Sequence, residues 1–301
     1  MIGSQPRPES SQGGVVQAVI QNIINGTMMG CIYALITLGL SLIFGVMNIV
    51  NFAHGDFVMI SMYFTFWASS LWAIETVATP LITFPFLFLF GILTYYLIIH
   101  KTLREKYVIQ IAITVGLMTF LRAVAQLLWK ASPRAISYSI VQGTFVIGNY
   151  TIMMSRFTSA VVSVAVIYLF SLFLNHTWQG RAIRAASDDL DAASLMGISY
   201  KWTYALAFGL GTAITAIAGG MLMTFQQVDP TMGLRFGLLS FCILALAGLG
   251  TTLGIIISGV IVGIAESLAM GMWDPRASSL VVYMIFILVL WLKPRGLFGR
   301  K

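Results

Sequence analysis

Charged residues are scarce in this chain. Asp, Glu, Lys and Arg make up 9% of its 301 residues, whereas a soluble globular domain carries about 25%. Hydrophobic residues reach 58%, which is more apolar surface than a soluble domain could bury. Uncharged runs of roughly 17 to 25 residues, the length that a bilayer requires of one helix, recur along the chain. The composition excludes a soluble globule and predicts an all-α polytopic membrane protein.

Signatures of catalysis are also absent. The sequence has no phosphate-binding loop, Rossmann glycine pattern, zinc signature or nucleophile elbow. Its two cysteines, Cys31 and Cys242, each lie in an apolar run, which predicts buried free thiols. The three histidines, His54, His100 and His176, do not cluster. A membrane enzyme would need a nucleophile, a histidine and an acid close together, so we expect no enzymatic activity, no cofactor and no metal; transport is the remaining function class.

The positive charge lies in short connectors and at the C-terminus. The formal net charge of +7 would suggest nucleic acid in another setting, but here it follows the rule that cationic loops stay cytoplasmic. Three basic clusters are therefore predicted to be cytoplasmic: Lys101, Arg104 and Lys106; Arg181, Arg184 and Lys201; Lys293, Arg295, Arg300 and Lys301. We expect a disordered polar tail over residues 1–14, a transmembrane domain over 15–292 and a basic cytoplasmic tail over 293–301.

The first uncharged segment is too long for one span. Val15 to Ala53 would form a helix of about 58 Å, almost twice the hydrocarbon thickness of a bilayer. We expect either two short spans or one span followed by a broken, re-entrant piece. The candidate break or close-packing points are the glycines Gly26, Gly30, Gly39 and Gly45.

The remaining apolar segments set the number of crossings. Spans are predicted at Phe57–Ala73, Pro80–Ile99, Tyr107–Trp129, Phe157–Leu174, Trp202–Val228 and Ala277–Leu292. Phe236–Met270 is again too long and is expected to cross twice, turning near Gly250-Thr251-Thr252. The prediction is about 8–10 transmembrane helices, some broken or short. Ten, with both termini inside, is preferred; nine, with the N-terminus outside, follows if the first segment stays whole.

Glycines spaced four residues apart recur in these spans. Such G-x-x-x-G pairs let helix backbones approach closely in lipid, where association depends on packing. The pairs are Gly26 and Gly30, Gly233 and Gly237, Gly250 and Gly254, and Gly259 and Gly263. Ordinary close packing is the expected role, with a hinge or cavity lining as the alternative.

One polar island, R-A-I-R-A-A-S-D-D-L-D-A-A-S-L-M-G-I-S-Y-K-W over residues 181–202, interrupts the apolar sequence. Its apolar residues Ile183, Ala186, Leu190 and Ala193 recur at spacings of three and four, which predicts one short amphipathic helix ending at Gly197. The helix could lie flat on lipid or dock into a partner. Three acids within four residues disfavour anionic lipid, so the pattern favours a cytoplasmic partner.

Several motifs resemble one transporter family. The segment D-A-A-S-L-M-G-I over residues 191–198 resembles the cytoplasmic E-A-A…G loop of ABC-transporter permeases, with Asp191 where Glu is usual. L-G-L-S-L-I-F-G-V-M-N-I-V-N-F-A-H-G-D-F over 38–57 is more specific and is similar to branched-chain amino-acid permeases of the binding-protein-dependent class. A-L-A-G-L-G-T-T-L-G over 245–254, G-I-A-E-S-L over 263–268 and K-P-R-G-L-F-G-R over 293–300 fit the same family, although G-G-x-G-S-x-x-G is common where this chain has Ala247 to Gly254.

The resemblance implies one membrane subunit of an importer in a bacterial cytoplasmic membrane. Its implied partners are a second homologous permease, two cytoplasmic ATPase subunits and a periplasmic or lipid-anchored substrate-binding protein. The loop over residues 175–201 would couple the permease to the ATPases through Ala186, Asp188, Asp189, Asp191, Ala192, Ala193 and Gly197. Related permeases that carry urea or short amides remain an alternative.

An ion-coupled secondary transporter is the alternative from another class. It is expected to show paired intramembrane acids or inverted repeats with matching broken helices. Glu266 is nearly the only candidate acid, and the sequence shows no convincing repeat.

Five polar residues are candidates for the transport pathway. Arg122 and Glu266 interrupt apolar helices at similar estimated depth, about 20 Å from the cytoplasmic side. We expect them to face each other or a shared hydrated vestibule, with independent snorkelling to the interface as the alternative. Asn51, His54 and Asp56 are expected to shape a broken helix near the pathway, or a polar turn at the membrane boundary.

Overall fold

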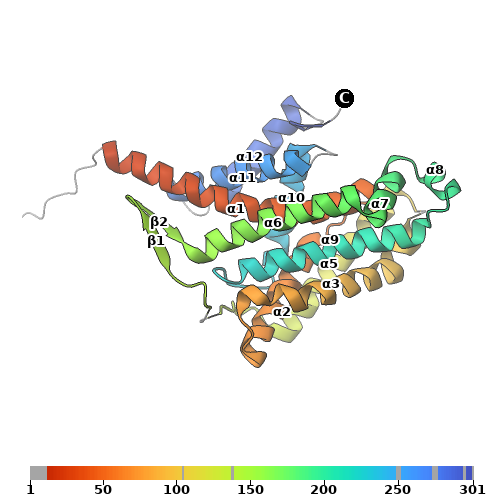
Figure 1. Cartoon of the computed structure of the whole chain (residues 1–301), viewed down its shortest axis with the longest axis horizontal. Helices are drawn as coiled ribbons and strands as arrows, with labels where there is room; N and C mark the ends of the chain where they lie inside the picture. The colour runs from red at the N-terminus through yellow and green to blue at the C-terminus, as the bar shows by residue number, and fades with distance from the viewer. Residues whose placement is uncertain are drawn as a thin grey trace, which may run out of the picture.

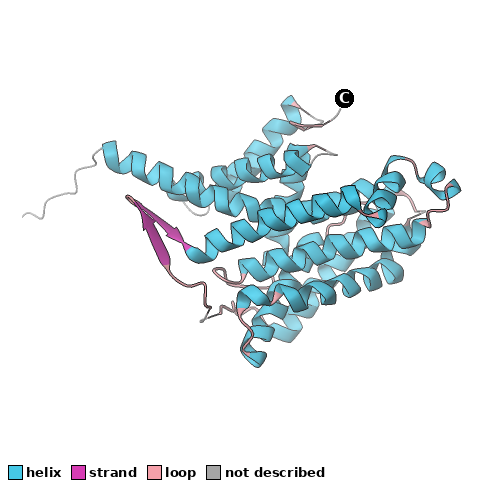
Figure 2. Cartoon of the chain, viewed as in Figure 1, coloured by secondary structure: helices cyan, strands magenta, loops and turns pink. Residues whose placement is uncertain are grey.

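A computed structural model describes residues 12–103, 105–136, 139–248, 252–272, 277–293 and 296–299, and within these ranges the chain is a bundle of long helices (Figures 1 and 2). The predicted all-α polytopic fold is confirmed. The main helices are α1 (Gln12–Met47), α2 (His54–Trp72), α3 (Pro80–Thr94), α5 (Tyr107–Trp129), α6 (Met154–His176), α7 (Trp178–Asp188), α8 (Leu190–Leu195), α9 (Tyr200–Leu222), α10 (Met232–Ala247), α11 (Thr252–Met272) and α12 (Ala277–Leu292).

Shorter elements complete the bundle. A 3-10 turn at Thr76–Ala78 precedes α3, and a π-helical turn at Tyr95–Ile99 joins α3 to the short α4 (His100–Thr102). An antiparallel hairpin, β1 (Thr144–Ile147) and β2 (Tyr150–Met153), precedes α6. The hairpin was not predicted, because the pattern considered was that of membrane-spanning helices.

Membrane-spanning length is reached by several helical stretches. Within the described ranges six are long and apolar enough to cross a bilayer: Gly14–Met47, Thr76–Thr102, Tyr107–Trp129, Met154–His176, Tyr200–Leu222 and Thr252–Met272. Apolar helices of shorter length cover Met232–Ala247 and Ser278–Leu292. The predicted interruption of the last long segment is confirmed, since α10 ends at Ala247 and α11 begins at Thr252. The rest of its predicted turn, Gly250 and Thr251, lies outside the described residues.

Helix α1 is one uninterrupted helix of 36 residues, about 54 Å long at 1.5 Å per residue. Of the two expected arrangements of this segment, that of two short spans is wrong, and with it the basis for preferring ten crossings. Gly26 and Gly30 pack closely against α11 without breaking the helix: a Cβ on Gly26 would lie 2.6 Å from the carbonyl oxygen of Gly263, and one on Gly30 would lie 2.6 Å from that of Gly259, whereas Gly45 has open space around it. The G-x-x-x-G pairs of α1 and α11 therefore face each other, as close packing requires.

The N-terminal boundary also differs from the prediction. Helix α1 begins at Gln12, so residues 12–14 of the expected disordered tail are helical. The expected tail over residues 1–11 lies outside the described part of the chain.

After α1 the chain turns back into the bundle. Asn48 adopts a positive φ of 53°, and residues 48–53 contain no regular helix before α2 begins at His54. The His54 ring lies 2.9 Å from the carbonyl oxygen of Ile36, a position roughly 16 Å back along α1 from its end. This is the other arrangement expected from the sequence, one span followed by a broken, re-entrant piece. Its backbone is tolerated at this depth because it is covered by protein.

A second irregular segment leads to α10. The first turn of α10 contacts the first turn of α2. A Cβ on Gly55 would collide with the backbones of Gly233 and Gly237, and a Cβ on Gly233 would collide with the carboxylate of Asp56. The N-terminal ends of two helices therefore approach each other inside the bundle without intervening side chains. This contact brings Asp56 to the start of both helices.

The helices before and after the α7–α8 segment pack in matching ways. Helix α1 packs along α11 as α9 packs along α3; α1 contacts α10 as α2 contacts α9; and α1 crosses α9 while α2 meets α10. Exchanging α1, α2 and α3 with α9, α10 and α11 therefore maps one set of contacts onto the other. Because α1 ends and α9 begins near α7 and α8 (Figure 1), the two sets run in opposite directions. The sequence itself shows no convincing repeat; the correspondence lies in the contacts between the helices.

Candidate coupling surface and intramembrane ion pairs

The polar island forms two helices at one end of the bundle, not the single helix expected. Helix α7 begins where the Thr177 hydroxyl accepts a hydrogen bond from the Gly180 amide at 3.0 Å. The chain breaks at Asp189, whose carboxylate then caps α8 by accepting from the Ala192 amide at 2.9 Å. Asp prefers such a cap because its short side chain satisfies an amide that the helix leaves free. The helix break is therefore encoded by one of the acids predicted to contact a partner.

The apolar face of α7 anchors it to the bundle. Ile183 and Ala186 are buried, and the Ser187 hydroxyl donates to the carbonyl oxygen of Gly45 at 2.5 Å. Gly180 has no room for a side chain, since a Cβ there would lie 2.5 Å from the Cα of Leu174. Helix α7 is thus fixed against the ends of α1 and α6.

The opposite side of the island is presented to solvent. Asp188, Asp189, Asp191, Ala192 and Gly197 are exposed, whereas Ala186 and Ala193 are buried. The structure therefore divides the seven predicted coupling residues into five that are accessible and two that support the helices.

Two large apolar residues at the tip were missed by the sequence analysis. Leu195 is 88% exposed and Met196 is 82% exposed, directly before the positive-φ residue Gly197 (82°). The turn is closed by hydrogen bonds from the Gly197 amide to Ser194 at 3.0 Å and from the Ile198 amide to Ala193 at 3.1 Å, so the predicted stop at Gly197 is confirmed. Adjacent exposed Leu and Met beside three acids form a surface suited to an apolar groove with a basic rim.

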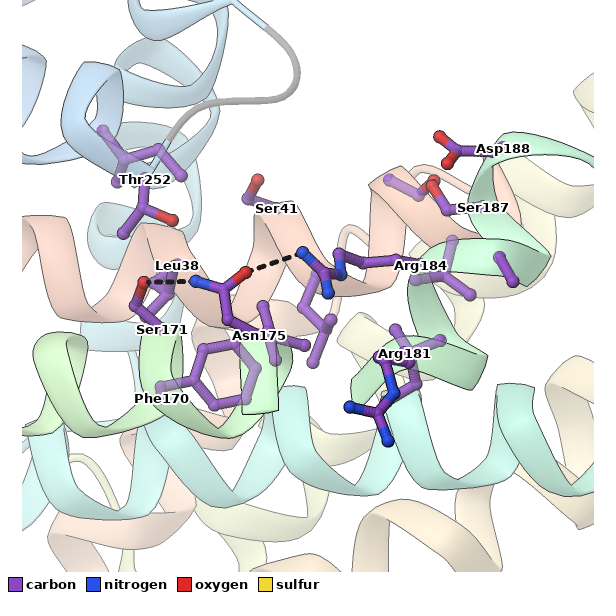
Figure 3. A pocket seen from close by; sticks show the side chains of 17 residues that line it. Leu38, Ser41, Phe170, Ser171, Asn175, Arg181, Arg184, Ser187, Asp188 and Thr252 are labelled. Carbon is purple, nitrogen blue, oxygen red and sulfur yellow. Dashed lines mark hydrogen bonds between the residues drawn. The ribbon is translucent and has the colours of Figure 1, made fainter. Parts of the chain in front are cut away.

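A cavity of about 730 Å³ lies behind α7, between α1, α6 and the start of α11 (Figure 3). Arg184 reaches across it and donates to the Asn175 side chain at 2.6 Å. Arg181 also lines this space, as do Ser41 and Thr252. The cavity thus lies between α7 and the membrane helices, beside the contacts that anchor α7.

The first intramembrane ion pair joins α5 to α2. Arg122 lies 3.4 Å from the carboxylate of Asp56, which is fully buried at the start of α2. The carboxylate also lies against Gly233 in the first turn of α10, and helix N-termini favour a negative charge. The expected approach of Arg122 to Glu266 is wrong, because the re-entrant chain supplies Asp56 as the partner instead.

The second intramembrane ion pair joins α10 to α11. Arg235 lies 2.9 Å from Glu266, and the Tyr33 hydroxyl of α1 donates to the same carboxylate at 2.7 Å. Sequence analysis missed Arg235 because it was treated as the boundary before the apolar run starting at Phe236. A basic residue four positions into a helix that begins at Met232 is the signal that could have found it.

The other two pathway candidates hold the re-entrant segment. The Asn51 side-chain oxygen accepts from the Ala53 amide at 3.1 Å, and His54 contacts the Ile36 carbonyl oxygen on α1. Both residues are fully buried. Together with Asp56 they lie at the break before α2, as expected for a broken helix.

A family model described as "Branched-chain amino acid transport system / permease component" matches residues 22–290. The chain belongs to this family. The resemblance to transport permeases seen in the motifs is therefore confirmed.

Two relatives align with almost the whole chain. The chain is 30% identical over 296 residues to the high-affinity branched-chain amino acid transport system permease protein LivH of Escherichia coli K12, covering 93% of this chain and 96% of that protein. It is 28% identical over 295 residues, with the same coverage, to the corresponding protein BraD of Pseudomonas aeruginosa. The fructose import permease protein FrcC of Rhizobium meliloti is 28% identical over 149 residues, 46% of this chain. No solved structure matches the permease component.

Proposed function

We propose that this permease component imports branched-chain or similar small amino acids across a prokaryotic cytoplasmic membrane, as one subunit of an ABC importer. The observation that carries the proposal is the similarity over nearly the whole length to LivH and BraD, whose names state that substrate class. The sequence has no phosphate-binding loop, so the energy is assigned to separate ATPase subunits.

The exposed residues Leu195 and Met196 at the end of α8 support the assignment of ATP hydrolysis to separate subunits. Leu195 and Met196 would insert into an apolar groove of an ATPase, while Asp188, Asp189 and Asp191 pair with basic residues at its rim. Ala186 and Ala193 hold the two helices against the bundle and transmit the displacement. Because the ATPases are cytoplasmic in this proposal, we infer that the loop over residues 175–201 and the tail over 293–301 face the cytoplasm.

Arg122 and Arg235 support the presence of a second homologous permease subunit. Their side chains are 20% and 32% exposed, Arg122 on α5, which is long enough to span a membrane, and Arg235 on the shorter apolar helix α10. A charge facing lipid costs about 3 kcal/mol or more, so we assign these exposed edges to a hydrated pathway shared between two permeases. Asp56 and Glu266, which are buried, orient the two arginines. A periplasmic or lipid-anchored binding protein would deliver substrate at the opposite end from α7 and α8.

Reconstitution tests the proposal. Proteoliposomes containing both permeases, both ATPases and loaded binding protein are expected to accumulate radiolabelled leucine only when ATP is supplied to the ATPases. The purified chain alone, under an imposed proton or sodium gradient, is expected to show no uptake above empty liposomes. Robust gradient-driven uptake by the chain alone would contradict the ABC assignment.

A further inference from the structure

A polar cavity lies at the end of the bundle opposite to α7 and α8. It has a volume of about 500 Å³ and lies between the start of α1, the hairpin and α6, which adjoin one another at the left of Figure 1. Its polar lining consists of Gln17, Gln21, Asn25, Asn149, Thr151 and Arg156. The volume falls within the range of small-molecule sites, about 300 to 1,000 Å³. No acid contributes to this lining.

Hydrogen bonds hold the wall of this cavity in place. Gln17 donates to the Asn149 carbonyl oxygen at 2.8 Å. Gln21 donates to the Thr151 carbonyl oxygen at 2.7 Å and accepts from the Thr151 amide at 3.0 Å. The side chain of Gln21 thus pairs with β2 as another strand would. The hairpin is therefore fixed to α1, and the cavity between them has a defined shape.

Arg156 differs from the two arginines of the ion pairs. Arg122 and Arg235 each contact a carboxylate, whereas Arg156 forms no ion pair with any residue that the structure describes. Its guanidinium lies 5.6 Å from the centre of the Phe225 ring, and its Nε is buried without a hydrogen-bond partner. A planar guanidinium recognises carboxylates through paired hydrogen bonds. The cavity therefore offers a positioned cation without an anion.

We propose that this cavity is a reception site in which Arg156 binds the carboxylate of an incoming amino acid. The side-chain oxygens of Gln17 and Asn25 can accept hydrogen bonds from the substrate's ammonium group, whereas both ends of the Gln21 amide hold the hairpin. The site rests on the proposed import of amino acids, since the ligand is a zwitterion released on the outer side.

Binding of tritiated leucine to the assembled permease–ATPase complex, without binding protein, tests the site. Unlabelled leucine and unlabelled leucinamide are compared as competitors of the tritiated leucine. Leucinamide is chosen because it keeps the shape of leucine and lacks its carboxylate. A hydrogen bond to a charged group contributes about 1.5 to 3 kcal/mol, so leucine is expected to compete about tenfold better or more. Arg156→Gln should abolish this preference, and Arg156→Lys should retain part of it.

Arg134 provides a matched control. Its guanidinium also lies over aromatic rings, 5.4 Å from Phe66 and 5.2 Å from Trp67, but it lines neither cavity. Arg134→Gln should leave the preference for leucine unchanged. Leucine import by the complete wild-type system, measured in parallel, tests the proposed function separately.

The outcomes separate the two proposals. If the wild type imports leucine and Arg156→Gln still prefers leucine to leucinamide, the reception site is overturned and the proposed import function is retained. Failure of the wild type to import leucine overturns the proposed function. If Arg156 binds a lipid phosphate instead, the variant keeps its preference for leucine and loses only the stabilisation by added phosphatidylglycerol, which also overturns the site.

Discussion

Glu266 and Arg235 should be energetically coupled, whereas Glu266 and Arg122 should not. Replacing Arg235 with Gln leaves the Glu266 carboxylate, with 5% of its side chain exposed, without its cation. Breaking a fully buried pair costs about 3 to 5 kcal/mol; because the Arg235 side chain is 32% exposed, we place the cost at the lower end, about 3 kcal/mol. Replacing both residues with Gln removes both charges and should cost less than the sum of the single changes, with a coupling energy of about 2 kcal/mol.

The assay is unfolding of the purified chain in mixed micelles with increasing sodium dodecyl sulfate, followed by tryptophan fluorescence. Two double-mutant cycles are compared, Arg235→Gln with Glu266→Gln and Arg122→Gln with Glu266→Gln. The second cycle should be additive within about 0.5 kcal/mol because the residues belong to separate pairs. Additivity in the first cycle, or strong coupling in the second, would refute the placement of these charges.

Two glycine substitutions test the packing and the coupling segment. Gly259→Val should prevent assembly of α1 with α11, since a Cβ there would lie 2.7 Å from the carbonyl oxygen of Gly30; membrane abundance should fall sharply, but not in Gly116→Val, where a Cβ meets nothing within 4 Å. Gly197→Leu should reduce binding-protein-stimulated ATPase activity while membrane abundance is kept, because a φ of 82° strains a side chain by about 1 to 2 kcal/mol and displaces the tip. Unchanged stimulation would show that α8 is a passive surface helix.

The sequence was informative where charge marks the ends of a helix. Tyr107–Trp129 was predicted with the bounds of α5, because Lys106 and Lys130 flank a largely apolar run. It was less informative inside α1, where Gly30 could have meant either a break or a contact. Only the opposing Gly259 distinguishes these meanings, and α11 lies more than 200 residues later in the chain.

The partners of the charged residues depended on the re-entrant segment. Depth was estimated by counting residues from the ends of each span, which assumes that every helix starts at a membrane surface. Helix α2 instead begins beside Ile36 of α1, so Asp56 reaches the level of Arg122. A one-dimensional count could not reveal this, because the return of the chain after Met47 is a tertiary feature. The two-helix form of the island likewise depended on a single cap at Asp189.

The uninterrupted α1 has a mechanical consequence. One end touches α7 through the Gly45 carbonyl oxygen, and the other holds the hairpin through Gln17 and Gln21. About 42 Å of rigid helix separates Gly45 from Gln17. A tilt of about 5° around its midpoint would move each end by roughly 2 Å in opposite directions. Helix α1 can therefore act as a lever. A displacement of α7 on one side of the membrane would change the shape of the cavity beside the hairpin on the other side.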